Sequence, residues 1–245
     1  MDIQVSNASL HWQHHCVFSQ LNLRLPGGQW TSILGQSGVG KSSLIQLLCG
    51  IADEADVQGE IRCSDGQPLT GRVAWMAQDD LLLPWLSVLD NVLLGARLTQ
   101  RRRPKPEQLE RARYLLAQVG LSERANALPA QLSGGQRQRV ALARTLFQDC
   151  PLVCMDEPFS ALDAINRLKL QDLAARLLYD RTVLMITHDP LEALRLSDRI
   201  LVLRGSPAKL STPITPSGQA PRQVSDTEVL RLQGELLEML AGETS

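Results

Sequence analysis

The sequence has little net charge, no long apolar run and few cysteines. Its 25 basic and 26 acidic residues leave a formal charge of −1, which argues against a generally basic nucleic-acid-binding protein. No stretch of about 18 consecutive apolar residues occurs, so we expect no membrane-spanning helix. Residues 1–5 do not combine a basic start with an apolar block, so we expect no signal peptide and a cytosolic protein.

The cysteines are Cys16, Cys49, Cys63, Cys150 and Cys154. An odd number without a Cys-x-x-Cys spacing argues against both a disulfide framework and a zinc site. We interpret most of them as packing thiols, because they stand among apolar or small residues. His11, His14 and His15 lie beside Cys16, but no second group of ligands is near in sequence, so surface-loop histidines are favoured over a metal site.

A phosphate loop is the most informative motif of the chain. Residues 35–42 follow the pattern Gly, four variable residues, Gly, Lys, Ser, between an apolar strand-like run (30–34) and a helix-like run (44–48). Main-chain amides and a helix start in this context bind phosphate oxygens. We expect Lys41 to reach the β- and γ-phosphates of a nucleoside triphosphate and Ser42 to bind Mg²⁺. A glycine-rich turn that matches by chance is the alternative.

Two later strands end in residues suited to hydrolysis. Residues 152–155 are apolar and lead into Asp156 and Glu157, and residues 182–187 lead into His188. The carboxyl ends of parallel strands line the ligand crevice of an α/β sheet. Asp156 therefore suits Mg²⁺ ligation, either directly or through a bound water. Glu157 suits activation of the attacking water, and His188 suits contact with the γ-phosphate. Taken alone, the acids could be a simple acidic turn and the histidine structural.

A second candidate anion site lies at residues 132–136, Leu-Ser-Gly-Gly-Gln, ahead of a helical run over 137–147. Ser133 is a natural helix N-cap, and the glycines leave amides exposed. The motif has no lysine, so we expect an incomplete site; a flexible serine-capped turn is the alternative. Residues 160–163, Ser-Ala-Leu-Asp, follow the acidic strand and open another helix.

The remaining segments predict one large α/β domain with a subsidiary lobe. Strands are expected at 3–10, 17–25, 59–62, 71–77 and 199–203, and a helical insert over about 88–147 that includes a helix at 107–119. Trp12 is either a half-buried core aromatic or a platform for a purine base. Residues 81–88 are more apolar than a solvent-exposed loop would be. This indicates that the segment either packs against its own domain or forms a surface for a partner.

Three segments complete the chain. Residues 101–105, Arg-Arg-Arg-Pro-Lys, are interpreted as a solvated loop, with contact to an anionic lipid or a partner as the alternative. Residues 206–223 are rich in Ser, Pro, Thr and Gln and predict a flexible linker. The last part of the chain predicts a short amphipathic helix whose apolar face holds Val229, Leu232, Leu236, Leu237 and Leu240.

In this order the motifs resemble the ATP-binding subunit of an ABC transporter over residues 1–205. The resemblance implies a P-loop ATPase core sheet with an antiparallel β subdomain and an α-helical insert subdomain. It implies catalytic roles for Lys41, Gln78, Glu157 and His188, and Mg²⁺ ligation by Ser42, Gln78 and Asp156. The ATP-binding residues that it implies are Trp12, Gly35, Gln36, Ser37, Gly38, Val39, Gly40, Lys41, Ser42, Ser43, Ser133, Gly134, Gly135, Gln136 and Asp163.

The resemblance also implies partners. The incomplete site at Ser133 would cap ATP held by the phosphate loop of a second, identical chain, and Asp163 would join the two sites. Gln78, residues 82–85, Val88 and Asn91 resemble importer ATPases for nitrate, taurine, alkanesulfonates and thiamine-precursor pyrimidines. We then expect permease subunits, an indirect solute-binding protein and a place on the cytoplasmic face of the inner membrane. A soluble ATPase of repair, translation or iron–sulfur assembly, or an exporter ATPase, remains the alternative.

Overall fold

A six-stranded sheet forms the centre of the protein. A computed structural model describes residues 1–13, 15–52, 55–100 and 104–242. The strand order is β5-β6-β7-β3-β8-β9, and all neighbours are parallel except β8 and β9. These strands are β3 (Trp30–Leu34), β5 (Val73–Met76), β6 (Leu152–Asp156), β7 (Thr182–Thr187), β8 (Arg199–Arg204) and β9 (Lys209–Leu210). Every residue of β3, β6 and β7 is buried, as their continuous apolar runs predict.

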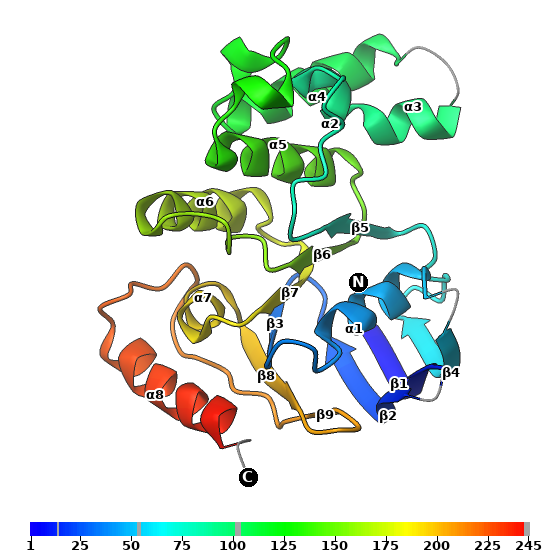
Figure 1. Cartoon of the computed structure of the whole chain (residues 1–245), viewed down its shortest axis with the longest axis vertical. Coiled ribbons are helices and arrows are strands. Elements are labelled where there is room, and N and C mark those ends of the chain that lie inside the picture. The colour runs from blue at the N-terminus through cyan, green and yellow to red at the C-terminus, as the bar shows by residue number, and fades with distance from the viewer. Residues whose placement is uncertain (14, 53–54, 101–103, 243–245) are drawn as a thin grey trace.

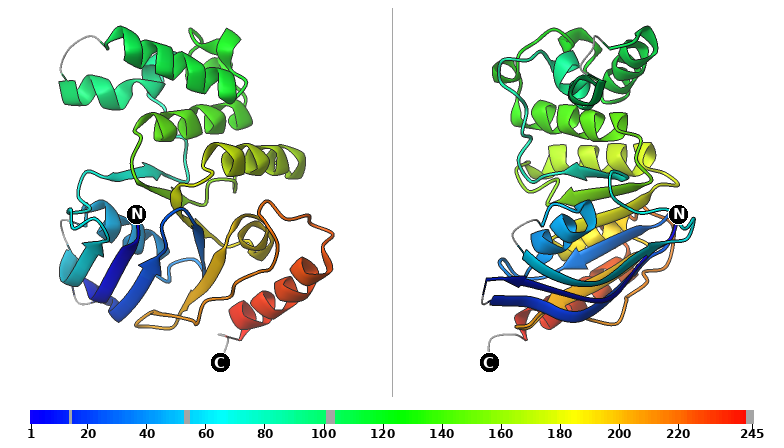
Figure 2. Two further views of the ribbon diagram at one scale, coloured as in Figure 1. Left: turned by 180° about the vertical axis from the view of Figure 1, so that it is seen from behind. Right: turned by 90° about the vertical axis from the view of Figure 1, so that its right-hand side faces the viewer.

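An antiparallel sheet of order β2-β1-β4 lies beside the central sheet (Figure 2). Its strands are β1 (Ile3–Trp12), β2 (His15–Leu25) and β4 (Ala55–Cys63), each longer than the strands expected at 3–10, 17–25 and 59–62. Helix α1 (Lys41–Cys49) packs in one apolar core with residues of both sheets, for example Ile3 and Leu152. The phosphate loop therefore leaves a buried strand and enters a helix held on two sides.

Other helices cover the remaining faces of the central sheet (Figure 1). Helices α5 (Gly134–Phe147) and α6 (Ala164–Leu177) share an apolar core with β6 and β7. Helices α7 (Pro190–Leu196) and α8 (Thr227–Ala241) pack with residues of β3 and β8. The predicted α/β class is correct, and the carboxyl ends of β3, β6 and β7 meet at one edge, where Leu34 pairs with Thr187 and Asp156 with Ile186.

The expected helical insert has its own apolar core, and its last helix, α5, joins it to the central sheet (Figure 1). It contains α2 (Val88–Val92), α3 (Leu94–Gln100), α4 (Pro106–Gln118), two 3₁₀ turns (Ser122–Arg124 and Pro129–Gln131) and α5. The helix predicted at 107–119 is α4, and the helix predicted at 137–147 begins three residues earlier. Of the basic segment 101–105, Arg101, Arg102 and Arg103 lie outside the described residues.

The prediction of a flexible linker at residues 206–223 is wrong. The segment is not a free linker, because β9 pairs with β8 and Ile214 forms a bridge with Ile200. Arg222, which is only 6% exposed, donates hydrogen bonds to the carbonyl oxygens of Leu194 and Ser197, both at 2.9 Å. The polar composition predicted a flexible linker, but main-chain pairing with β8 and the buried guanidinium of Arg222 hold the segment against the domain. The apolar face of α8 is also narrower than expected, since Leu237 is half exposed.

Candidate active site

The phosphate loop is built for an anion. Helix α1 begins at Lys41 without a side-chain cap, which leaves its first-turn N–H groups for a ligand. Gly40 has a φ of 105°, and a Cβ there would lie 2.3 Å from Val17 Cγ1, so only glycine fits. Lys41 Nζ donates to the carbonyl oxygens of Gly35 at 2.8 Å and Gln36 at 2.9 Å, which holds the ammonium inside the loop.

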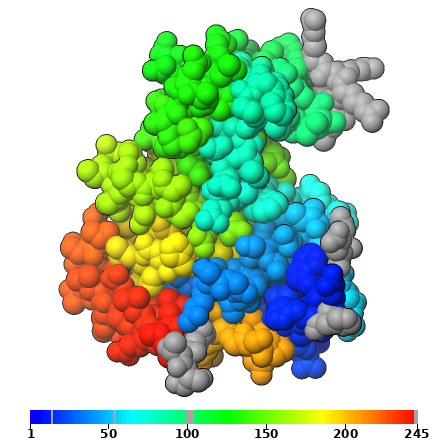
Figure 3. All heavy atoms as spheres, in the orientation of Figure 1, coloured from blue at the N-terminus to red at the C-terminus, as the bar shows by residue number. Residues whose placement is uncertain are grey.

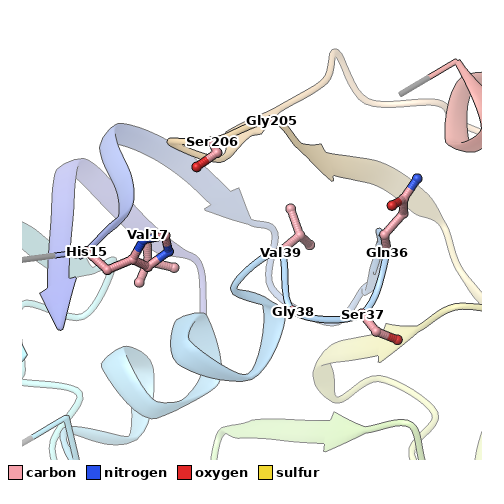
Figure 4. A pocket seen from close by; sticks show the side chains of 8 residues that line it. All are labelled: His15, Val17, Gln36, Ser37, Gly38, Val39, Gly205 and Ser206. Atoms are coloured by element: carbon pink, nitrogen blue, oxygen red, sulfur yellow. The ribbon is translucent and has the colours of Figure 1, made fainter. Parts of the chain in front are cut away.

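A cavity of about 560 Å³ opens beside this loop (Figure 4). Its lining brings together residues from three separate parts of the chain, His15, Val17, Gln36, Ser37, Gly38, Val39, Gly205 and Ser206. The β1–β2 hairpin supplies two of them, and the turn after β8 supplies two more. A cavity of this size suits a nucleotide-sized ligand. The lining residues that lie outside the phosphate loop belong to no sequence motif, so the sequence could not identify them as part of the cavity.

Ser42 and Asp156 form the next part of the site. Ser42 Oγ donates to Asp156 Oδ2 at 2.8 Å, although 114 residues separate them. Burial raises the pKa of Asp156 and lowers the pKa of Lys41, whose charged form the carboxylates of Glu157 and Asp156 favour in turn. A hydroxyl and a carboxylate side by side are hard oxygen donors of the kind that Mg²⁺ prefers beside nucleotide phosphates. The residues therefore fit the ion.

Glu157 and His188 meet at the ends of β6 and β7. His188 Nδ1 lies 3.0 Å from Glu157 Oε2, and the His188 side chain is 59% exposed. Glu157 has a φ of 45°, and its N–H donates to the carbonyl of Ile186 at 2.8 Å. A non-glycine residue in this conformation is uncommon and marks positions where a side chain is aimed by the fold. The pair can orient water and accept its proton.

The second candidate anion site occupies a different cavity, of about 230 Å³, at the start of α5. Ser133 Oγ accepts from the Gln136 N–H at 3.3 Å, and Gln136 Oε1 accepts from the Ser133 N–H at 2.9 Å, a capping box. Asp163 caps α6 and accepts from the Asn166 main chain and side chain, which lowers the pKa of its carboxyl. The cavity is lined by Ser133, Gly135, Gln136, Arg139, Leu162, Asn166 and Leu170.

Side chains of α5 hold the segment that follows β5. Gln138 Nε2 donates to the Gln78 carbonyl at 3.1 Å, and Arg137 Nε donates to Asp80 Oδ2 at 2.8 Å. Arg144 donates to the carbonyls of Asp80 and Leu81. Gln78 itself is exposed two residues beyond β5. The segment after β5 is therefore joined to the helix that begins at Ser133.

Trp12 lies at the end of β1, half-buried against the same apolar core as α1. It pairs with His15 across the hairpin, and His15 and Val17 line the cavity beside the phosphate loop. The stacking role of Trp12 stays a prediction. The hairpin end that carries it reaches this cavity, which sequence spacing could not show. Of the histidine cluster, His14 lies outside the described residues.

The phosphate loop, the Ser42–Asp156 pair and the Glu157–His188 pair define a P-loop nucleoside triphosphatase with a helical insert. Residues 18–160 match the ABC transporter family. The chain is 48% identical over 244 residues to an uncharacterised ABC transporter ATP-binding protein of Haemophilus influenzae, with 98% of this chain and 99% of that protein covered. The chain belongs to the ABC transporter family of ATP-binding proteins, which hydrolyse ATP to drive transport.

Further relatives agree with this assignment. The aliphatic sulfonates import ATP-binding protein SsuB of Escherichia coli K12 is 40% identical over 235 residues, which cover 94% of this chain and 87% of that protein. A dimeric ATP-binding cassette bound to ADP and phosphate superposes with a TM-score of 0.74 at 29% identity, covering 89% of this chain and all of that chain. The structure of an inward-facing ABC transporter superposes with a TM-score of 0.74 at 32% identity. The match covers 85% of this chain and 82% of that chain.

Proposed function

We propose that this chain is the ATP-hydrolysing subunit of an importer for an organic anion such as a sulfonate, and that two copies share each active site. One observation carries the proposal. The phosphate-loop cavity and the Ser133 cavity have no lining residue in common. Each is half of an anion site, so a head-to-tail pair of chains would place the Ser133 half over ATP held by the other chain.

The residues support a direct mechanism. Main-chain N–H groups of the loop and Lys41 hold the β- and γ-phosphates. Ser42 and Asp156, together with Gln78 as the family resemblance implies, would hold Mg²⁺, which would neutralise charge on the phosphate oxygens. Glu157 accepts the proton of the attacking water, and His188 orients the γ-phosphate while its Nδ1 keeps Glu157 in place. Closure by a second chain would supply Ser133, Gln136 and Asp163.

The exposed segment after β5 supports coupling to a permease. Among the described residues no helix is long and apolar enough to cross a bilayer. Trp85 is 71% exposed. Asn91 is buried and fixes the turn beneath Trp85, donating to the carbonyls of Leu83, Leu86 and Ser87. A rigid exposed tryptophan suits a partner surface, and the segment is joined through α5 to the Ser133 cavity. The chain would then sit on the cytoplasmic face of the membrane.

Affinity purification from solubilised cells tests this function. We expect an integral membrane permease to copurify with the chain, and Trp85→Ala to lose it while ATP hydrolysis by the purified chain is retained. A solute-binding protein encoded alongside separates an importer from an exporter. Recovery of ribosomes or a soluble scaffold would instead favour the soluble-ATPase alternative. The sulfonate-like solute is supported by the names of relatives such as SsuB, and the solute bound by the associated receptor identifies it.

A further inference from the structure

A basic cavity lies on the side of the helical insert, away from the phosphate loop. Its volume is about 460 Å³, within the range of small-molecule sites, and it is formed by the end of α4, by α5 and by α6. Helix α5 lies between α4 and α6 (Figure 1). The lining residues are Gln118, Val119, Gly120, Arg139, Lys169, Asp172, Leu173 and Arg176. Apart from Arg139, which also lines the Ser133 cavity, none of them has a role in the mechanism above.

The cavity carries excess positive charge. In the described part of the chain, Arg139, Lys169 and Arg176 have no ion-pair or hydrogen-bond partner for their side chains. The one carboxylate in the lining, Asp172, accepts from Arg195 NH2 at 2.6 Å, so its charge is already compensated. Three uncompensated cations around one hollow favour an anionic ligand.

The arrangement of these cations indicates the shape of the ligand. Lys169, Leu173 and Arg176 stand at positions i, i+4 and i+7 of α6 and so share one face of the helix. The Arg139 guanidinium reaches this space from α5, because a Cβ on Gly120 would lie 3.6 Å from its NH1. Leu173 and Val119 add apolar surface. The cations can surround a multidentate oxyanion while the apolar side chains contact a small organic body.

We propose that this cavity binds an organic anion with a tetrahedral oxyanion group, either a sulfonate or a phosphate ester. Arg139 also lines the Ser133 cavity. An anion that holds its guanidinium beside Gly120 would keep a cation out of the proposed composite ATP site, so ligand binding should lower ATP hydrolysis. This regulatory part depends on the proposed function, whereas the binding site does not.

Calorimetric titration of the full chain in buffer of low ionic strength tests the site. The probes are propanesulfonate, propyl phosphate and inorganic phosphate, with uncharged dipropyl sulfone as the control ligand. We expect propanesulfonate, propyl phosphate or both to bind and dipropyl sulfone not to bind. Preference for propanesulfonate or propyl phosphate identifies the source of the ligand, and binding of inorganic phosphate alone would overturn the organic part of the proposal.

Variants locate the site. The double variant Lys169→Gln/Arg176→Gln should weaken anion binding roughly tenfold or more, which corresponds to about 1.4 kcal/mol, and should keep the basal ATPase activity. The matched variant Arg113→Gln/Lys209→Gln removes two exposed cations that lie outside the cavity lining and should leave binding unchanged. Amide NMR shifts at Gly120 and Leu173 should follow the titration.

Binding at the phosphate loop is the competing explanation. Lys41→Ala should retain binding of the anion probes if the basic cavity is the site, and should lose it if the phosphate loop is. Equal affinity in the wild type and in Lys169→Gln/Arg176→Gln would reject the site. If the anion probes bind but ATP hydrolysis does not fall, only the regulatory part is rejected. Normal ATP hydrolysis in the absence of the anion would show that the proposed function is unaffected by that result.

Discussion

At the scale of single residues, the 3.0 Å contact between Glu157 and His188 supports the proposal that Glu157 is the base. Changing Glu157→Gln keeps the side-chain shape and a hydrogen-bond acceptor but removes the proton acceptor. We expect ATP turnover to fall by roughly 10²- to 10⁴-fold and nucleotide affinity to stay unchanged, as measured by phosphate release and by equilibrium titration. Undiminished turnover would reject Glu157 as the base.

Lys41 is expected to act in binding. Its ammonium is buried and turned into the loop by two carbonyl oxygens, and Lys41→Ala would remove the charge-assisted contacts with phosphate that we propose for it. We expect affinity for a labelled ATP analogue to fall by about 10- to 100-fold, the equivalent of about 1.4–2.7 kcal/mol. Lys105→Ala, which removes an exposed lysine at the start of α4, is the control and should bind the analogue normally.

The buried carboxylate of Asp156 should lower the stability of the folded protein at neutral pH. Burial raises the pKa of its carboxyl above the ordinary value of 3.8, so the folded chain holds this proton more tightly than the unfolded chain. Stability from this group is present below pH 3.8 and is lost as the pH rises through the folded pKa. Asp156→Asn should therefore raise the melting temperature at neutral pH while hydrolysis falls. An equal gain at pH 3 would contradict the electrostatic cause.

At the scale of helices and strands, the chemistry of the site could be predicted more fully than its surroundings. Ser42 and Asp156 were expected to approach the same ion because parallel strands end at one edge, and their 2.8 Å contact confirms that they meet. His15 and Val17 were not foreseen as cavity residues, since only the packing of the β1–β2 hairpin against Gly40 brings them there. Such contacts between distant segments leave no local pattern.

The contacts of the segment before α8 also could not be predicted from the sequence. They lead to a prediction about stability. The Arg222 side chain donates five hydrogen bonds to main-chain carbonyls, of Leu194, Ser197, Pro216, Ser217 and Gly218. Arg222→Ala would leave buried carbonyls without partners. We expect the free energy of unfolding to fall by about 2–4 kcal/mol in chemical denaturation. Arg204→Ala, at an exposed position, should change it by less than about 0.5 kcal/mol.

At the scale of the whole molecule, the proposed shared site predicts that a single chain cannot complete a site. A chain with Lys41→Ala lacks a working phosphate loop, and a chain with Ser133→Arg lacks a working cap. Each should be inactive alone. In a mixed dimer, the intact loop of the Ser133→Arg chain faces the intact cap of the Lys41→Ala chain, so one of the two sites is whole.

Mixing equal amounts of the two inactive variants should therefore restore ATP hydrolysis. Random pairing makes half of the dimers mixed, and half of their sites are intact, so about one quarter of the wild-type activity is expected if the two sites act independently. Mixing either variant with a chain carrying both substitutions is the control and should restore nothing, because no such dimer joins an intact loop to an intact cap. Activity in isolated Ser133→Arg chains would contradict a shared site, since the phosphate loop would then suffice by itself.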